Sequence, residues 1–163
     1  MKAILKFIKK HSRAIFIVYI LILLIVLVLK FPQMNMFHSI VERWRTGKPS
    51  RFVTETNFVP FKIIIEYIKN AHSYNDWFTK NLAANIIMFI PLGFLAPLFM
   101  RRNKLWQIII YGIIVSIMIE ILQVLLAVGT GDIDDVILNA FGTLMGFGIY
   151  KLIYSVALKN SLD

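Results

Sequence analysis

The chain has 163 residues, of which 58% are hydrophobic and 17% are charged. Soluble globular domains carry about a quarter charged residues, so this composition does not fit that class and favours a membrane protein. The formal net charge is +9, from 18 basic and 9 acidic residues, which on a soluble protein would raise nucleic-acid binding as a candidate. The bases instead flank apolar runs, a pattern typical of membrane topology signals, so no nucleic-acid partner is expected. The absence of cysteine excludes a disulfide framework, a thiolate metal site and a cysteine nucleophile.

Four apolar segments are long enough, with their flanks, to cross a bilayer as helices. They cover about residues 14–30, 82–100, 105–128 and 133–150. No small-residue cleavage site follows the first segment, so we interpret it as a retained helix rather than a signal peptide. The short connections at 101–104 and 129–132 predict two hairpins, so the last three helices must be neighbours. The expected fold is all-α, with residues 1–163 forming a single integral membrane domain of four transmembrane helices.

Basic residues predict the orientation of these helices. They cluster before the first span, between the second and the third, and after the fourth, at Lys2, Lys6, Lys9, Lys10, Arg13, Arg101, Arg102, Lys104, Lys151 and Lys159. The positive-inside rule assigns all three clusters to the cytoplasm, so we expect a multi-pass protein of the cell membrane with both termini inside. The long segment 31–81 then lies outside, where its own bases are diluted by acids. The fourth span reaches Leu158 instead of Tyr150 if Lys151 extends its amine to the membrane surface.

The outer segment contains one amphipathic pattern. Its apolar residues recur at helical spacing at Phe61, Ile64, Ile65 and Ile68, and Lys62, Glu66 and Lys69 share the opposite face. Pro60 suits the first turn of a helix. The pattern predicts a short extracytoplasmic helix between spans one and two, lying on the outer membrane surface. The alternative is a soluble helix packed against the rest of the loop.

The third span carries polar residues that are costly in a bilayer and therefore need partners or a role. Ser116, Glu120, Gln123 and Ala127 recur at i, i+4, i+7 and i+11, so they share one helix face. That face is expected to point away from lipid. Glu120 indicates a functional role, because an ionisable group is a poor choice for simply holding helices together.

The fourth span carries a matching stripe of Asp135, Asn139, Gly142 and Gly146, in which the glycines allow close contact between helices. Asn85, near the start of the second span, lies at a similar depth to Glu120 and Asn139 if each residue rises about 1.5 Å. These positions predict one outward-facing polar pocket, with the ligand-binding residues Asn85, Glu120, Gln123, Asp132, Asp135 and Asn139. The competing interpretation of the three amides is interhelical hydrogen bonding, at about 0.6 kcal/mol each.

Three acids follow the glycine-bearing turn before the fourth span. Asp132, Asp134 and Asp135 offer the oxygen ligands that a divalent cation prefers. A helix N-cap with acids in its first turn explains Asp132 and Asp134 better, so no metal site is assigned. The sequence also names no cofactor.

Four motifs resemble those of the VanZ-like family, which is named for a teicoplanin-resistance protein. They are Asn57–Phe61, Asn85–Gly93, Glu120–Gln123 and Asp132–Asn139 followed by Gly142, in family order over about residues 51–148. The resemblance implies a bacterial envelope protein that lowers susceptibility to lipoglycopeptide antibiotics such as teicoplanin. The chain departs from many members at Thr54 and at Gly129–Gly131, where they carry an arginine.

Two functions compete. The first is a binding protein that engages an envelope lipid, the drug or a lipid-linked wall precursor in the polar pocket. The second is an intramembrane enzyme acting on a lipid-linked substrate, with Glu120 as general acid or base and Asp135 or a metal as its partner. A transporter is disfavoured, because four helices without a repeat leave little room for alternating access unless the chain forms an oligomer.

Overall fold

The structure, a computed structural model, describes residues 2–29, 41, 45–46, 56–69, 76–100, 104–125 and 130–159. Over these residues it contains five helices: α1 (Lys2–Leu29), α4 (Lys62–Lys69), α5 (Asp76–Phe99), α6 (Leu105–Leu125) and α7 (Ile133–Lys159). The described part of the chain holds no strand beyond one isolated bridge between Asn57 and Asp132. The prediction of an all-α fold is therefore confirmed for that part.

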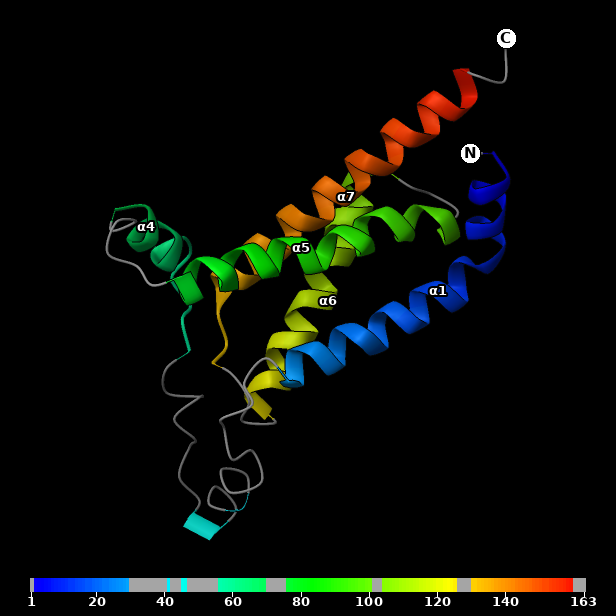
Figure 1. Ribbon diagram of the computed structural model, residues 1–163. Helices are drawn as coiled ribbons and strands as arrows, with labels where there is room; N and C mark the ends of the chain where they lie inside the picture. The colour runs from blue at the N-terminus through cyan, green and yellow to red at the C-terminus, as the bar shows by residue number, and fades with distance from the viewer. Residues whose placement is uncertain are drawn as a thin grey trace.

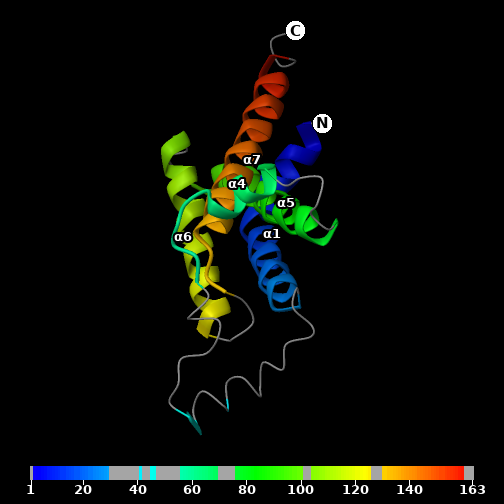
Figure 2. The same cartoon turned by 90° about the vertical axis from the view of Figure 1, so that its left-hand side faces the viewer.

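The four long helices gather into one bundle, with α4 beside its end (Figure 1). The start of α5 and the start of α7 lie at this end, called the α4 end below, whereas the start of α1 and the end of α7 lie at the opposite end (Figures 1 and 2). α6 runs back toward the starting side of α7, as the two predicted hairpins require. Consecutive helices from α5 to α7 therefore run in alternating directions.

Within the part of the chain that the structure describes, three helices are long and apolar enough to cross a membrane. The qualifying stretches are Lys80–Leu98, Leu105–Leu125 and Ile133–Ser155. They agree with the predicted spans 82–100, 105–128 and 133–150, although residues 126–128 lie outside the described part and α7 continues beyond Tyr150 to Lys159. The predicted span 14–30 falls on α1 and ends on Lys30, outside the described residues, so the fourth crossing stays a prediction.

The closest helix pair is α5 with α7, and glycines of α7 make it possible. A Cβ atom added to Gly142 would overlap the carbonyl oxygen of Ile86, and one added to Gly146 would overlap that of Ile90. The two backbones therefore touch, as the predicted stripe of small residues requires. Gly148, by contrast, faces open space.

Thr143 fills the junction of α5, α6 and α7 and is completely buried. A Cβ added to Gly93 of α5 would overlap the Thr143 backbone, and one added to Gly112 of α6 would lie 2.5 Å from its hydroxyl oxygen. That hydroxyl donates to the carbonyl oxygen of Asn139, at 2.9 Å, so it is satisfied within α7. The small residues thus bring three helices together around one buried side chain.

α1 packs against α5 and α6 through ordinary apolar contacts. Leu23 is buried in a cluster with Phe89 and Leu92 of α5 and Ile119 of α6. The Tyr19 hydroxyl donates to the carbonyl oxygen of Met88, at 2.7 Å. These contacts place α1 against α5 and α6.

α4 forms where the amphipathic pattern predicted a helix, but it starts later. Its first residue is Lys62, two positions after Pro60, and Phe61 between them adopts a positive φ of 62°. The left-handed conformation at Phe61 turns the chain into the helix and is rare for a bulky residue. The lie of this helix on a membrane surface stays a prediction.

Candidate functional site

The polar face predicted for α6 is buried. The buried residues of this helix are Ile108, Gly112, Ser116, Ile119, Glu120 and Gln123, which recur at helical spacing. On α7, Asn139, Gly142 and Gly146 are buried as well, and Asp135 is half-buried. The structure therefore confirms that both predicted polar faces point into the bundle, while Ala127 lies outside the described residues.

The two faces meet first through Asn139 and Ser116. The Asn139 amide donates to the Ser116 hydroxyl at 2.8 Å, and both residues are buried. This bond joins α6 to α7 directly, as the structural interpretation of the amides expected. Asn85 of α5 is also buried, at 3% exposure.

The loop before α4 is attached to the start of α7 by a short parallel bridge. The Asn57 backbone N–H donates to the carbonyl oxygen of Gly131 at 2.8 Å, and the N–H of Ile133 donates to the carbonyl oxygen of Asn57 at 3.0 Å. The Asn57 side-chain amide adds a bond to the Asp132 carboxylate, at 2.9 Å. Segments 75 residues apart in the chain are thereby fixed side by side.

Asp132 caps α7. Its carboxylate accepts the backbone N–H of Asp134 at 2.9 Å, which is the geometry of an N-cap and confirms that interpretation of Asp132. Burial raises the pKa of the Asp132 carboxyl above its usual value. The N–H of Asp134 and the amide of Asn57 oppose this rise, because they donate to the charged form.

Asp134 caps a different helix from the one on which it stands. Its side chain is completely buried and accepts the backbone N–H groups of Phe61, Ile63 and Ile64, the last two at 2.7 and 3.2 Å. These are the N–H groups that a helix start leaves unpaired, so the carboxylate anchors α4 to α7. The described part of the chain contains no group of three His, Cys, Asp or Glu able to hold a metal ion.

Glu120 reaches the same junction from α6. Its side chain is only 9% exposed, and its Oε2 accepts the backbone N–H of Asp132 at 3.0 Å. Three elements therefore converge on the start of α7 and the turn before it: the Asn57 segment, α4 through Asp134, and α6 through Glu120. This convergence is called the acid junction below.

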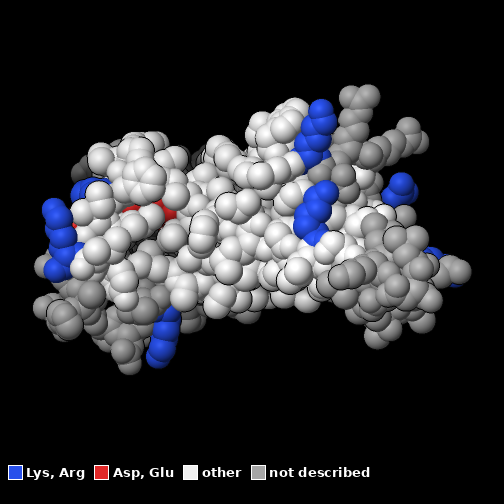
Figure 3. All heavy atoms as spheres, turned by 90° about the horizontal axis from the view of Figure 1, so that it is seen from above, with Lys and Arg blue, Asp and Glu red and all other residues white. Residues whose placement is uncertain are grey.

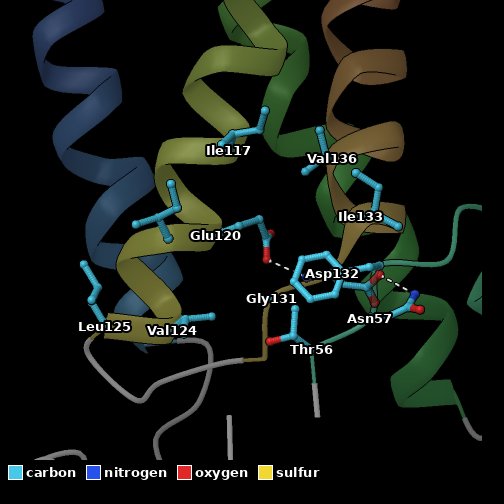
Figure 4. Close-up of a pocket in the computed structure, with 12 residues that line it drawn as sticks. Thr56, Asn57, Ile117, Glu120, Val124, Leu125, Gly131, Asp132, Ile133 and Val136 are labelled. Carbon is cyan, nitrogen blue, oxygen red and sulfur yellow. Dashed lines mark hydrogen bonds between the residues drawn. The ribbon is translucent and has the colours of Figure 1, made fainter. Parts of the chain in front are cut away.

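A cavity of about 460 Å³ opens beside the acid junction, between α6 and α7. Its lining consists of Thr56, Asn57, Phe58, Ile117, Glu120, Ile121, Val124, Leu125, Gly131, Asp132, Ile133 and Val136. Figure 4 shows Glu120 extending from α6 toward the turn at Asp132, with Ile117 and Val136 farther along the two helices. Apolar side chains thus form most of the wall, and the carboxylates lie together at one side.

The predicted pocket residues divide into two groups. Glu120 and Asp132 line the cavity, whereas Asn85, Gln123, Asp135 and Asn139 are not among its lining residues. Asn139 instead joins α6 to α7, as described above. The cavity is also more apolar than the polar pocket that was expected.

Sequence reasoning missed the contribution of the loop before α4. Thr56, Asn57 and Phe58 all line the cavity, and Asn57 holds the turn in place. The signal was present, because Asn57 opens the first of the family motifs, but no partner for it was inferred. The capping of α4 by Asp134 was missed as well.

The surface of the bundle agrees with a membrane protein. On the face in Figure 3, Lys and Arg gather toward the two ends, and a stretch of uncharged residues lies between them. The Asp and Glu atoms visible on this face lie at the α4 end. Uncharged side chains that are exposed on the three apolar helices are expected in a protein that is surrounded by lipid instead of water.

Comparisons with known proteins agree with the motifs. The model of the VanZ/LLP1 family matches residues 16–154. Protein VanZ of Enterococcus faecium is 30% identical over 84 residues, which cover 52% of this chain and 52% of that protein. No solved structure matches significantly. Because the family model covers most of the sequence, including all the residues of the acid junction, this chain belongs to the VanZ/LLP1 family.

Proposed function

We propose that this chain is a multi-pass membrane protein that lowers susceptibility to teicoplanin-type lipoglycopeptides by engaging an amphiphile at the outer membrane surface. The amphiphile is an envelope lipid, the drug itself or a lipid-linked wall precursor. Membership of the VanZ/LLP1 family supports the resistance role. The cavity between α6 and α7 supports the binding role and is the observation that carries it.

The cavity suits an aliphatic chain with a polar group at one end. Its volume of about 460 Å³ lies in the range of about 300–1,000 Å³ that is usual for ligand sites. Ile117, Ile121 and Val136 offer apolar contacts along α6 and α7, and each buried CH₂ group of a ligand gains about 0.8 kcal/mol. Glu120 and Asp132 supply polar contacts where the chain would end.

The proposed orientation places the α4 end outside the cell and both termini in the cytoplasm. The basic clusters near Lys10, Lys104 and Lys151 support it, because the positive-inside rule assigns them to the cytoplasm. The bundle geometry is compatible, since α1 begins and α7 ends at the same side (Figure 1). In this orientation the cavity opens near the outer leaflet.

An intramembrane enzyme is the second candidate, and the position of Glu120 favours it. A carboxylate that lines a cavity and is fixed by a backbone N–H can transfer a proton to or from a bound substrate. Against this, the lining residues include no His, Cys, Ser or Lys, and Thr56 alone provides a hydroxyl. A complete set of nucleophile, base and orienting group is therefore missing from the described lining.

One comparison separates the two candidates. Teicoplanin susceptibility is measured together with the mass spectra of envelope lipids and wall precursors, in cells expressing wild type, Glu120→Gln or Asn139→Ala. The binding proposal expects unchanged composition, with resistance reduced in Glu120→Gln. A modified lipid or precursor made by wild type and absent from Glu120→Gln would contradict binding alone and establish the enzyme.

Orientation has its own test. The chain has no cysteine, so Thr130→Cys introduces a single thiol at the turn before α7. The proposal expects this thiol to react with a membrane-impermeant reagent in intact cells, and Lys104→Cys to react only after lysis. The opposite labelling pattern would contradict the outward-facing cavity.

A further inference from the structure

The excess positive charge of the chain is confined to three short segments. Residues 2–13, 101–104 and 151–159 hold ten of the 18 bases and none of the nine acids. The remaining eight bases share the rest of the chain with all nine acids, so the charges there nearly cancel. The net charge of +9 therefore originates in these three segments, which are called the basic segments below.

The three basic segments border the same end of the bundle, opposite the α4 end. α1 begins there and α7 ends there (Figures 1 and 2). Ala96 near the end of α5, Ile108 near the start of α6 and Tyr150 of α7 pack in one buried cluster. The segment that joins α5 to α6 therefore borders this end as well. The acids visible in Figure 3 lie at the other end, beside α4.

The bases that the structure describes in these segments are exposed: Lys10, Arg13, Lys104 and Lys151. Like charges that gather at one end of a bundle repel one another and weaken its packing. α1 has little to offset this repulsion, because Ser12 is the one buried residue among the described side chains from Phe7 to Ala14. No acid of the basic segments supplies a counter-charge, so the counter-charge has to come from elsewhere.

Exposed aromatic residues indicate where these bases lie relative to a membrane. Phe7, Trp106 and Tyr154 are exposed, and each is within three residues of a described base. Trp and Tyr favour the level of the lipid head groups, where bases meet phosphate. Lys151 is also held in place, because its amine lies 5.4 Å from the centre of the Phe147 ring. The described bases are therefore positioned at the level where a lipid carries its charge.

We propose that anionic phospholipids bind the basic segments through their head groups and hold α1 to the bundle by neutralising the repulsion between the segments. Phosphate oxygens accept charge-assisted hydrogen bonds from Lys and Arg, and one head group can bridge bases of two helices. In the proposed orientation these lipids belong to the inner leaflet. The inference concerns the end of the bundle away from the cavity and does not depend on the function proposed for it.

The expected preference follows from the number of bases that a head group contacts. Each Lys or Arg near an anionic membrane surface strengthens binding about five-fold. A head group that contacts two bases is therefore expected to bind about 25-fold more tightly than a zwitterionic one. Salt reduces this preference, because it screens charges that are exposed.

The test uses full-length protein in nanodiscs of phosphatidylglycerol and phosphatidylcholine in equal amounts. Native mass spectrometry counts the lipids that stay bound when the nanodisc is removed. Wild type is expected to retain phosphatidylglycerol about 25-fold over phosphatidylcholine at about 50 mM salt, and at most a few-fold at about 500 mM. Hydrogen exchange is measured in parallel. The α1 amides around Ser12 are expected to exchange at least about ten-fold more slowly with phosphatidylglycerol present than in phosphatidylcholine alone.

Two variants with the same loss of charge locate the site. The first combines four substitutions in the basic segments: Lys10→Gln, Arg13→Gln, Lys104→Gln and Lys151→Gln. The matched control combines four at exposed bases elsewhere: Arg45→Gln, Lys62→Gln, Lys69→Gln and Lys80→Gln. The first variant is expected to lose both the lipid preference and the slower exchange of α1, and the control to keep both. Wild type at high salt repeats the test without any substitution.

Three results would overturn the inference. The first is equal retention of the two lipids by wild type. The second is a preference that both variants lose or both keep, because it would then not originate at the basic segments. The third is slow exchange of α1 that inorganic phosphate restores in phosphatidylcholine alone, because a free anion would then replace the lipid. None of these results bears on the cavity, so the proposed function stands or falls separately.

Discussion

The attachment of α4 to α7 depends on one buried carboxylate, and Asp134→Asn tests it. The substitution keeps the shape of the side chain but removes the charge that three backbone N–H groups share. Asparagine has one acceptor oxygen, whereas both carboxylate oxygens of Asp134 accept here, so at least one N–H loses its acceptor and the remaining bonds become neutral ones. Hydrogen bonds to charged groups are worth about 1.5–3 kcal/mol and neutral ones about 0.5–1.5, so the total loss is at least about 3 kcal/mol. At about 1.4 kcal/mol for each factor of ten, the equilibrium between α4 attached to α7 and α4 detached from it shifts about a hundred-fold toward the detached state.

Hydrogen exchange measures this loss locally. The amides of Phe61, Ile63 and Ile64 are expected to exchange about a hundred-fold faster in Asp134→Asn than in wild type, while amides in the middle of α6 keep their protection. Asp135→Asn is the matched control, because all three hydrogen bonds are accepted by Asp134 and none by Asp135. If the three amides exchange within two-fold of wild type in Asp134→Asn, Asp134 does not anchor α4.

Three further predictions concern the bundle and its junction. Gly142→Leu is expected to separate α5 from α7 and lower the melting temperature in detergent by at least about 5 °C, whereas Gly148→Ala leaves it unchanged because that site is open. Asn139→Ala is expected to cost about 1 kcal/mol of unfolding free energy, and the loss should largely disappear in a Ser116→Ala background, as a double-mutant cycle would show. Burial raises the pKa of Asp132 in the folded protein, so the folded state binds the proton more tightly than the unfolded chain. Wild type should therefore lose stability relative to Asp132→Asn as pH rises from about 4 through the raised pKa; a difference independent of pH in chemical unfolding would contradict this.

Periodic features were predictable from the sequence. The burial of Ser116, Glu120 and Gln123 follows from their spacing alone, since helical residues three and four apart share a face. The backbone contacts at Gly142 and Gly146 follow from the size of glycine and the shortness of the loops. Such features follow from the regular geometry of a helix, so the residues of a single segment are enough to predict them.

Long-range pairings were not predictable in the same way. Asn57 and Asp132 are both visible as polar residues next to helices, but nothing in either segment names the other. Asp134 looked like an acid in the first turn of its own helix, and the structure shows it capping α4 across 70 or more residues. The apolar character of the cavity was missed for a related reason, because Ile117, Ile121 and Val136 form one wall only through the packing of α6 beside α7.

The central claim is that an outward-facing cavity between α6 and α7 is the site of the resistance function. The most direct test measures teicoplanin susceptibility in cells expressing wild type, Ile121→Trp or Ile114→Trp at equal membrane abundance. Filling the cavity with Ile121→Trp is expected to return susceptibility to that of cells without the protein, while Ile114→Trp protects like wild type. Full protection by Ile121→Trp would contradict the account, because the function would then be independent of the cavity.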